Sequence, residues 1–435
     1  MTAQTTPRTA PRGGPNPAAR RAFAGSVAGH LIEWYDYGVY GYLAVYMGAA
    51  FFPSDDPLVS VLSSFAVFAL SFFIRPLGGL FFGPLADRIG RRRTLLIVLT
   101  VMASSTFLIG LLPTYAAIGV AAPLLLVLVR CVQGFSAGGE VGTVASFIAE
   151  HASGARRGFA TSWLLAISAA GLVIGALVVN GLTWWLGSET MAEGGWRIPF
   201  LIAGPLGLIT LWLRMRLEDS PAFLSMQAAS EGAKSPLRAA FAQPRALLLV
   251  FGVVTLATSS FYLVLTYYTT LMRTALGLDA STVFFASIGA AVLAGAFMPV
   301  GGLISDRFGR RRPMIVYAVI AIALCLAVFY AAATTSIALF LVFAVALAIV
   351  SGLYGGSVYA LMSELLPTRI RATGLAISYN LPVALFGGSA PFVATLLISA
   401  TGSLASPGYY FAATGVLSLI TLLMIRPRDQ VGIDA

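Results

Sequence analysis

Long apolar stretches constrain this chain more than any other feature. We count twelve of them, each about 20 residues long, centred on about residues 35, 71, 103, 135, 171, 207, 258, 294, 324, 348, 386 and 416. A helix of that length crosses a bilayer and satisfies its own backbone hydrogen bonds, and none of the stretches shows the two-residue alternation of a membrane barrel. The sequence therefore predicts an all-α polytopic membrane protein with twelve transmembrane helices.

The composition and the distribution of charge support this prediction. The 435 residues are 58% hydrophobic and 10% charged, whereas a soluble protein has about 25% charged residues. The formal net charge is +10, and all 27 basic residues except Arg75, Arg130, Arg197 and Arg273 lie in the tails or in the even-numbered connections between stretches. This asymmetry follows the positive-inside rule rather than a nucleic-acid footprint. It predicts a bacterial-type cytoplasmic membrane, both termini in the cytoplasm, and no nucleic-acid partner.

The chain also repeats itself. The segment "GPLADRIGRRR" (83–93) returns as "GLISDRFGRRR" (302–312), and "SAGGE" (136–140) has a weaker echo in "LYGGS" (353–357). Two parallel copies of a six-helix unit are the architecture of one large class of membrane transporters. We therefore expect two six-helix bundles, at 21–217 and 244–427. The remaining expected segments are a disordered cytoplasmic tail at 1–20, a cytoplasmic linker at 218–243 and a cytoplasmic tail at 428–435.

The repeated Gly-x-x-x-Asp-Arg-x-Gly-Arg-Arg-Arg segments carry the first candidate functional residues. Each aspartate can bond to a helix N-terminus, where the helix dipole favours an anion. A run of positive charge that only sets topology is the alternative, but recurrence at equivalent places in both halves favours a structural switch. The residues assigned to this gating role are Asp87, Arg88, Arg91, Asp306, Arg307 and Arg310.

The first apolar stretch contains two carboxylates and an imidazole. At 100° per residue, His30, Glu33, Asp36, Tyr37 and Tyr40 fall within about 120° of one helix face. A carboxylate at the membrane centre costs about 2.5–3.5 kcal/mol and usually faces a cavity or a partner. A neutral acid or a structural ion pair would explain one such residue. Three on one face favour a proton-coupling site made of Glu33, Asp36 and His30. Tyr37 and Tyr40, on the same face, are expected to bind substrate.

Charged residues also lie inside the second and fourth stretches. Arg130 falls near mid-membrane and shares a face with Gln133; its guanidinium keeps its charge and suits a carboxylate. We expect both residues to bind substrate, although Arg130 can also neutralise Glu33 or Asp36. For Arg75 and Glu140, a helix-to-helix ion pair or a gate is favoured over substrate contact.

The second half has no charged residue inside its apolar stretches. Tyr262, Tyr354 and Asn380 are the polar candidates there for a neutral wall of the substrate site, although aromatic residues in such stretches more often pack or face lipid. No nucleotide-binding, metal-ligand or catalytic motif is visible, and the chain has only 2 histidines and 2 cysteines. We therefore expect no metal, no cofactor other than the proton gradient, and no enzymatic activity.

Several of these segments together resemble the metabolite:proton symporter family of the major facilitator superfamily. They are "EWYDYGVYG", "IRPLGG", "LADRIGRRR", "RCVQGFSAGGE", "GWRIPF", "SDRFGRRR" and "SELLPTRIRATG". The resemblance covers about residues 24–425. It implies the major facilitator fold and uptake driven by the proton gradient, with Glu33, Asp36 and Arg130 near the transport path.

Three departures within that family bear on the substrate. The family usually has asparagine where this chain has His30. The proline/betaine branch has a long C-terminal coiled coil, which this chain lacks, and a lysine where this chain has Arg130. The last two differences favour a carboxylate substrate.

The sequence hypothesis is therefore secondary active symport of a small organic acid, such as a di- or tricarboxylate or keto acid, with protons. Its partners are the substrate, protons and the lipid bilayer, and we expect a functional monomer. A zwitterionic osmolyte such as proline or glycine betaine is the alternative. A receptor would need an output domain, and an enzyme would need a set of catalytic residues. Neither is visible in the sequence. An efflux antiporter shares the fold, and only the resemblance argues against it.

Overall fold

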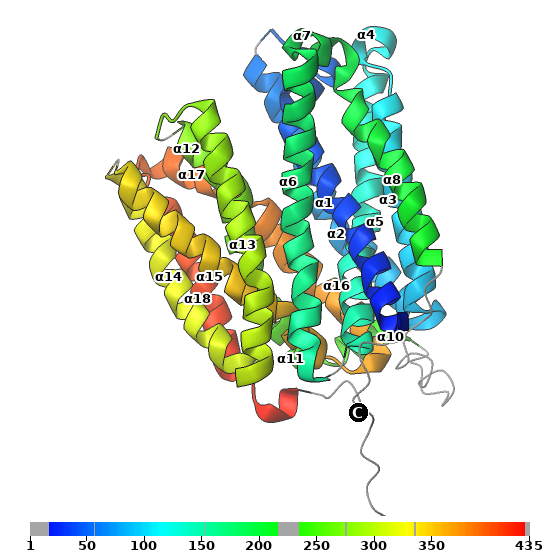
Figure 1. The fold of residues 1–435 in the computed structure, drawn as a ribbon, viewed down its shortest axis with the longest axis vertical. Helices are drawn as coiled ribbons and strands as arrows, with labels where there is room; N and C mark the ends of the chain where they lie inside the picture. Colours follow the sequence, from blue (N-terminus) through cyan, green and yellow to red (C-terminus); the bar gives the residue numbers. More distant parts are fainter. Residues whose placement is uncertain are drawn as a thin grey trace, which may run out of the picture.

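The computed structural model describes residues 17–55, 57–152, 154–215, 235–274, 276–334 and 336–430. Within these ranges the chain forms helices and no strand, which confirms the predicted all-α class (Figure 1). The predicted N-terminal tail (1–20) lies largely outside the described residues. The same is true of most of the predicted linker (218–243) and of most of the predicted C-terminal tail (428–435). Of the linker, the structure describes only residues 235–243, which include the short helix α10 (Pro236–Phe241).

Six long helices form the N-terminal bundle. They are α1 (Pro17–Phe51), α2 (Pro57–Ile89), α3 (Arg91–Leu111), α5 (Ala121–His151), α6 (Arg157–Leu186) and α8 (Arg197–Met215). Short helical turns join them at α4 (Tyr115–Ile118) and α7 (Ser188–Thr190). The chain reverses between α2 and α3 at Gly90, whose φ of 101° suits a residue without a Cβ.

The C-terminal bundle repeats this order with two broken helices. Its helices are α11 (Pro244–Tyr262), α12 (Tyr268–Thr274), α13 (Ala280–Phe308), α14 (Arg311–Ala333), α15 (Ile337–Glu364), α16 (Arg371–Pro382), α17 (Ala390–Thr401) and α18 (Ser406–Met424). A π-helical segment, Leu263–Tyr267, joins α11 to α12, and a second one, Val383–Gly388, joins α16 to α17. Each joined pair is one membrane span, so this bundle also contributes six spans.

Eleven helices of the described chain are long and apolar enough to cross a membrane by length and hydropathy. The twelfth span is α1, which packs against α6 and α2 inside the N-terminal bundle. Its carboxylates and tyrosines lower its hydropathy. Large apolar side chains cover the outside of both bundles, for example Phe81, Leu208, Phe285 and Phe392. Such a surface fits lipid rather than water.

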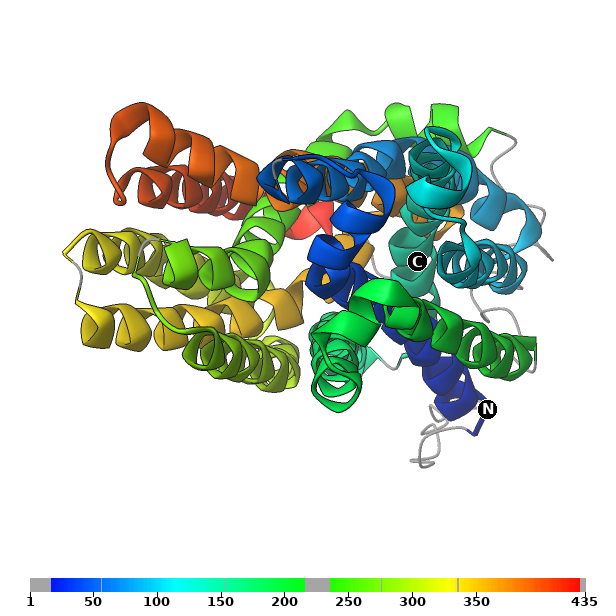
Figure 2. The ribbon, with the colours of Figure 1, turned by 90° about the horizontal axis from the view of Figure 1, so that it is seen from above.

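The two bundles contact each other in a reciprocal way. Helix α6 of the first bundle packs against α13 and α15, while α16 of the second packs against α2 and α5. Figure 1 shows the bundles close together at the end that carries the repeated segments 83–93 and 302–312, here called the motif end. They diverge toward the opposite end, and the view from above shows them side by side (Figure 2).

Candidate functional site

Glu33 on α1 forms a buried ion pair with Arg75 on α2. Arg75 donates a hydrogen bond from Nη2 to Oε1 of Glu33, and both side chains are 1% exposed. The guanidinium also lies over the rings of Tyr37 and Phe72, at 5.2 and 5.3 Å from their centroids. Its Nε and Nη1 atoms have no hydrogen-bond partner within the described residues. Arg75 is thus fixed by Glu33 and two rings but keeps donors to spare.

A second ion pair lies beside the first, and His30 stands between them. Arg214 on α8 donates from Nη2 to Oε1 of Glu140 on α5, at 3.2 Å. The Nδ1 atom of His30 lies 3.6 Å from Oε2 of Glu33 and 3.8 Å from Oε1 of Glu140. His30 is 0% exposed. The structure therefore joins five ionisable groups. Arg214 is one of the basic residues that the charge pattern assigns to the tails and even-numbered connections, yet its guanidinium reaches this buried cluster.

A third buried pair joins Arg130 on α5 to Asp36 on α1. Arg130 donates from Nη1 to Oδ2 of Asp36 at 2.7 Å and to Oε1 of Gln133 at 2.6 Å. Its guanidinium stacks 3.7 Å from the centroid of Tyr40, and Gln133 in turn donates to Thr106. In this structure Arg130 therefore balances Asp36, one of the two pairings that the sequence left open. Its assignment as a substrate ligand stays a prediction.

A small pocket lies between the two bundles, against α1. Its walls are mostly aromatic. The residues that line it are Trp34, Leu165, Ala257, Thr258, Phe261, Tyr262, Val358, Tyr359 and Tyr379. Arg75 lies next to this pocket through Phe72, whose ring is 5.3 Å from the guanidinium. Phe72 bridges the pocket and the ion pairs, with its ring centroid 5.7 Å from that of Tyr262 and 5.3 Å from that of Tyr37.

Of the residues predicted for a neutral wall, only Tyr262 lines this pocket. Tyr354 is buried and donates from its hydroxyl to the carbonyl of Val253. Asn380 donates to the carbonyl of Gly138, which ties α16 to α5. Four aromatic residues of the pocket were not singled out from the sequence: Trp34, Phe261, Tyr359 and Tyr379. Trp34 was detectable, because it lies next to Glu33 on the first stretch.

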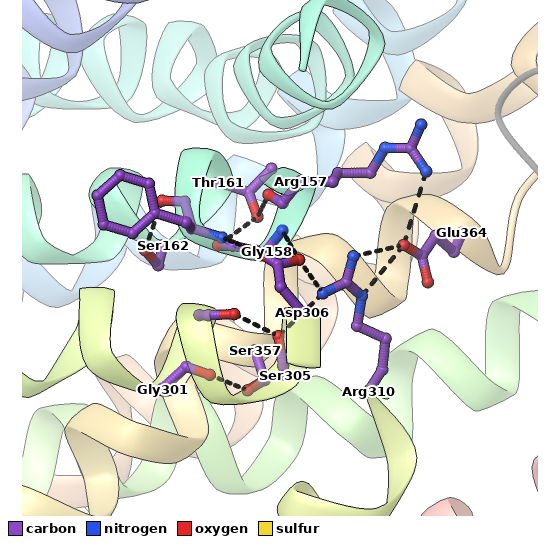
Figure 3. Close-up of polar contacts among 12 residues, drawn as sticks. Arg157, Gly158, Thr161, Ser162, Gly301, Ser305, Asp306, Arg310, Ser357 and Glu364 are labelled. Atoms are coloured by element: carbon purple, nitrogen blue, oxygen red, sulfur yellow. Dashed lines mark hydrogen bonds and ion pairs between the residues drawn. The ribbon is translucent and has the colours of Figure 1, made fainter. Parts of the chain in front are cut away.

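The repeated segments meet the opposite bundle at the motif end. Asp306 at the end of α13 accepts hydrogen bonds from the backbone N–H groups of Gly158 and Phe159, both at 2.8 Å, in the first turn of α6 (Figure 3). In the other half, Asp87 at the end of α2 accepts from the backbone N–H of Thr373 at 2.9 Å, in the first turn of α16. Each aspartate thus caps a helix of the other bundle, where the dipole favours a negative charge.

Arginines and glutamates reinforce both contacts in the same pattern. Arg310 pairs with Asp306 at 2.5 Å and Glu364 at 3.1 Å, and Arg157 of the other bundle lies 3.7 Å from Glu364 (Figure 3). Burial opposes the charge of Arg310, but Glu364 and Asp306 raise the pKa of its guanidinium above the ordinary value. Arg310 therefore keeps its charge at physiological pH.

The equivalent network in the other half is buried more deeply. Arg91 pairs with Asp87 at 3.0 Å and with Glu150 at 3.3 Å, and Glu150 also accepts from Arg371 of the second bundle at 3.0 Å. The remaining predicted gating arginines, Arg88 and Arg307, are exposed at the ends of α2 and α13. The gating role of these segments stays a prediction, to which the structure adds the atoms that hold the bundles together.

One group in the described chain brings enough ligand atoms together to be considered for a metal ion. His30, Glu33 and Glu140 offer atoms that lie within 4.8 Å of one another. However, Arg75 and Arg214 already bond to the two carboxylates. The two neighbouring guanidinium groups already balance the carboxylates and make a divalent metal ion unfavourable here, so we do not assign a metal site to this cluster.

Comparisons with known proteins agree with this architecture. The family model described as Major Facilitator Superfamily matches residues 27–381. The proline/betaine transporter of Salmonella typhimurium (strain LT2) is 39% identical over 419 residues, which cover 94% of this chain and 83% of that protein. The citrate-proton symporter of Klebsiella pneumoniae is 33% identical over 408 residues, which cover 94% and 92% of the two chains.

Solved structures share the fold at lower identity. The proton:xylose symporter XylE bound to 6-bromo-6-deoxy-D-glucose has a TM-score of 0.78 and 17% identity, with 95% of this chain and 97% of that chain covered. The resemblance found in the sequence is therefore confirmed over nearly its whole length, together with two six-helix bundles. The chain belongs to the major facilitator superfamily.

Proposed function

We propose that this protein is a proton-coupled symporter that takes up a small zwitterionic solute, one with a carboxylate and a methylated ammonium group. The observation that carries this proposal is the aromatic pocket between the bundles, which Phe72 connects to Arg75: the ring of Phe72 lies 5.7 Å from Tyr262 of the pocket and 5.3 Å from the Arg75 guanidinium. Aromatic rings attract a methylated ammonium through their electron-rich faces, worth about 0.5–2 kcal/mol for each well-placed ring. A guanidinium with spare donors suits the carboxylate at the other end of such a solute.

Proton coupling follows from the ion pair between Glu33 and Arg75. A guanidinium does not release its proton at physiological pH, so the carboxylate has to be the group that titrates. A proton on Glu33 cancels the charge that holds Arg75 and frees the guanidinium for the carboxylate of the solute. The site therefore binds the solute and the proton together, and it releases them together. His30 extends the same site toward Glu140, and Asp36 with Arg130 forms a second pair of this kind.

Alternating access is supported by the contacts at the motif end. With the predicted orientation, this end faces the cytoplasm, so the described arrangement is closed on the cytoplasmic side. Breaking the contacts of Asp87 and Asp306 with the opposite bundle would open that side. We propose that proton and solute binding close the far end and that these two contacts then open. The protein needs no cofactor for this cycle, and one chain contains the whole path.

The organic acid predicted from the sequence is the second candidate substrate. The observation in its favour is Arg130, whose Nε and Nη2 atoms have no hydrogen-bond partner in the described chain and could hold a second carboxylate. The relatives support both candidates, because their names include proline/betaine transport and citrate–proton symport.

Uptake by the purified protein in liposomes separates the candidates. Labelled glycine betaine, proline and citrate are each offered with the outside acidic and again without a pH gradient. We expect accumulation of glycine betaine above equilibrium only with the gradient. Accumulation of proline but not of glycine betaine would show that the site does not select a methylated ammonium. Gradient-driven accumulation of citrate alone would assign the organic acid instead. Accumulation that is independent of the gradient would overturn proton symport. Liposomes with the Asp36→Asn and Glu33→Gln double variant serve as the control.

A further inference from the structure

We propose that Trp34 links the protonation of His30 to the shape of the solute pocket. This inference rests on the proposed proton-coupled function, but not on which solute is carried. The Nε2 atom of His30 has two neighbours: Nε1 of Trp34 donates to it from 3.2 Å, and Oγ of Ser168 lies 2.9 Å away. Trp34 also lines the pocket. One side chain therefore touches both the proton site and the solute site.

The two neighbours of Nε2 compete for one position. In the plane of the ring, Nε2 carries either a lone pair or a hydrogen. The indole N–H of Trp34 can only donate, so its bond requires the lone pair. The hydroxyl of Ser168 can accept as well as donate. In the neutral ring with its hydrogen on Nδ1, Nε2 accepts from Trp34; in the imidazolium, the Nε2–H donates to Ser168 and repels the indole N–H.

Two carboxylates and two guanidinium groups surround the imidazole of His30. Two carboxylates face Nδ1, those of Glu33 on its own helix and Glu140 on α5, at 3.6 and 3.8 Å. Two guanidinium groups, Arg75 on α2 and Arg214 on α8, bond to those carboxylates and limit their effect. The proton comes from water, adds to the lone pair of Nε2, raises the charge of the cluster by one, and returns to water when the neutral ring forms again.

Release of the indole changes the wall of the pocket. The ring of Trp34 packs edge-on against Phe261 of the second bundle, with centroids 5.2 Å apart, and lies 6.4 Å from Tyr262. Helix α6 passes close behind it, since a Cβ placed on Gly171 would lie 2.7 Å from the Cβ of Trp34. The backbone is held there, so the indole responds by turning about its side-chain bonds. Protonation of His30 thus moves an aromatic wall that joins the two bundles.

Titration of His30 tests the inference without any solute. The chain has only 2 histidines, so histidine-labelled full-length protein in nanodiscs gives two imidazole signals, and a His151→Gln variant assigns them. Trp34→Phe removes the donor that stabilises the neutral ring, so the midpoint of His30 is expected to rise by about 0.5–1 pH unit. Ser168→Ala removes the acceptor that stabilises the imidazolium, so the midpoint is expected to fall by a similar amount. Trp163→Phe, on an exposed part of α6, is the matched control and leaves it unchanged.

Opposite shifts in the two variants support the inference, whereas shifts in the same direction, or none, overturn it. Folding of each variant is checked by thermal unfolding, and Ser168→Ala still tests the bond if Trp34→Phe does not fold. A second measurement adds the solute identified by uptake. The added solute is expected to raise the pH midpoint of the His30 titration in the parent protein and not in Trp34→Phe, because coupling between two sites is reciprocal. Opposite shifts without uptake of any tested solute overturn the proposed solute class and leave the Trp34–His30 link standing.

Discussion

Thr373 of the second bundle donates two hydrogen bonds to Asp87 of the first, from its backbone N–H at 2.9 Å and from its hydroxyl at 2.6 Å. Both reach the same carboxylate oxygen, Oδ2, and Asp87 is 4% exposed. The equivalent aspartate of the other half, Asp306, bonds across to the opposite bundle through backbone N–H groups only. The Asp87 contact is therefore more deeply buried and has one side-chain donor that its counterpart lacks.

Replacing Asp87 with asparagine is expected to open the motif end. Hydrogen bonds to a charged group contribute about 1.5–3 kcal/mol, so Asp87→Asn lowers the equilibrium constant between the closed and the open motif end by about ten-fold or more. Spin labels on cysteines at the exposed positions 93 and 312 report the distance between the bundles, in a background with Cys131 and Cys325 replaced by alanine. Asp279→Asn, which changes a helix cap at the far end, is the control. An unchanged distance distribution in Asp87→Asn would contradict the proposal that the Asp87 contact keeps the motif end closed.

Glu33→Gln is expected to separate solute movement from proton movement. The amide keeps the shape of the side chain but cannot bind the transported proton, and it no longer holds Arg75 by charge. Accumulation driven by a pH gradient is expected to fall by about ten-fold or more, while exchange of labelled for unlabelled solute continues. Both are measured in the same liposomes. Full gradient-driven accumulation by Glu33→Gln and by Asp36→Asn would exclude both carboxylates from coupling.

Substitutions of Tyr262 test the aromatic pocket. Tyr262→Phe keeps the ring and is expected to change the half-saturating concentration of solute by less than about three-fold. Tyr262→Ala removes the ring and is expected to raise it by about ten-fold for glycine betaine. Citrate has no ammonium group, so its uptake provides the comparison. Equal losses for a methylated ammonium and for a carboxylate-only solute would show that the ring acts by packing alone.

Two glycines of α5 are expected to respond differently to the same change. A Cβ on Gly142 would lie 2.7 Å from the backbone nitrogen of Ala376, so Gly142→Ala pushes α16 of the other bundle away. A Cβ on Gly138 would collide with the carbonyl oxygen of Arg75 inside its own bundle. Overpacking costs about 1–3 kcal/mol. Gly142→Ala should therefore widen the labelled distance at the motif end, whereas Gly138→Ala should lower the unfolding temperature. Gly41→Ala, with open space around its position in the described chain, should do neither.

The fold was predictable because membrane spans and repeats are local patterns. Apolar length and the returning segment at 302–312 were sufficient for two six-helix bundles, and the charges of the first half identified where the ion pairs lie. The pairing itself was not predictable. Arg130 could have met Glu33 or Asp36, and the choice of Asp36 depends on how α1 and α5 pack, which one sequence does not reveal.

Two further features were missed for physical reasons. Arg214 was grouped with the basic residues of a connection, but it lies in the last turn of α8 and points back to Glu140. Long arginine side chains reach several ångströms from their backbone, so position in the sequence does not fix their depth. Phe261, Tyr359 and Tyr379 looked like any other aromatic residues of apolar helices. Only their arrangement around one pocket distinguishes them from residues that face lipid.

The two π-helical segments divide the spans that contain them into mechanically separate parts. Wide turns of this kind interrupt the regular hydrogen-bond ladder and allow a helix to bend. Leu263–Tyr267 and Val383–Gly388 both lie between an inner half-helix that packs against α18 or α5 and a short outer one, α12 or α17. The outer halves, α12 and α17, can therefore change their tilt while α11 and α16 stay in place, so one span can take part in a rigid bundle at one end and move at the other.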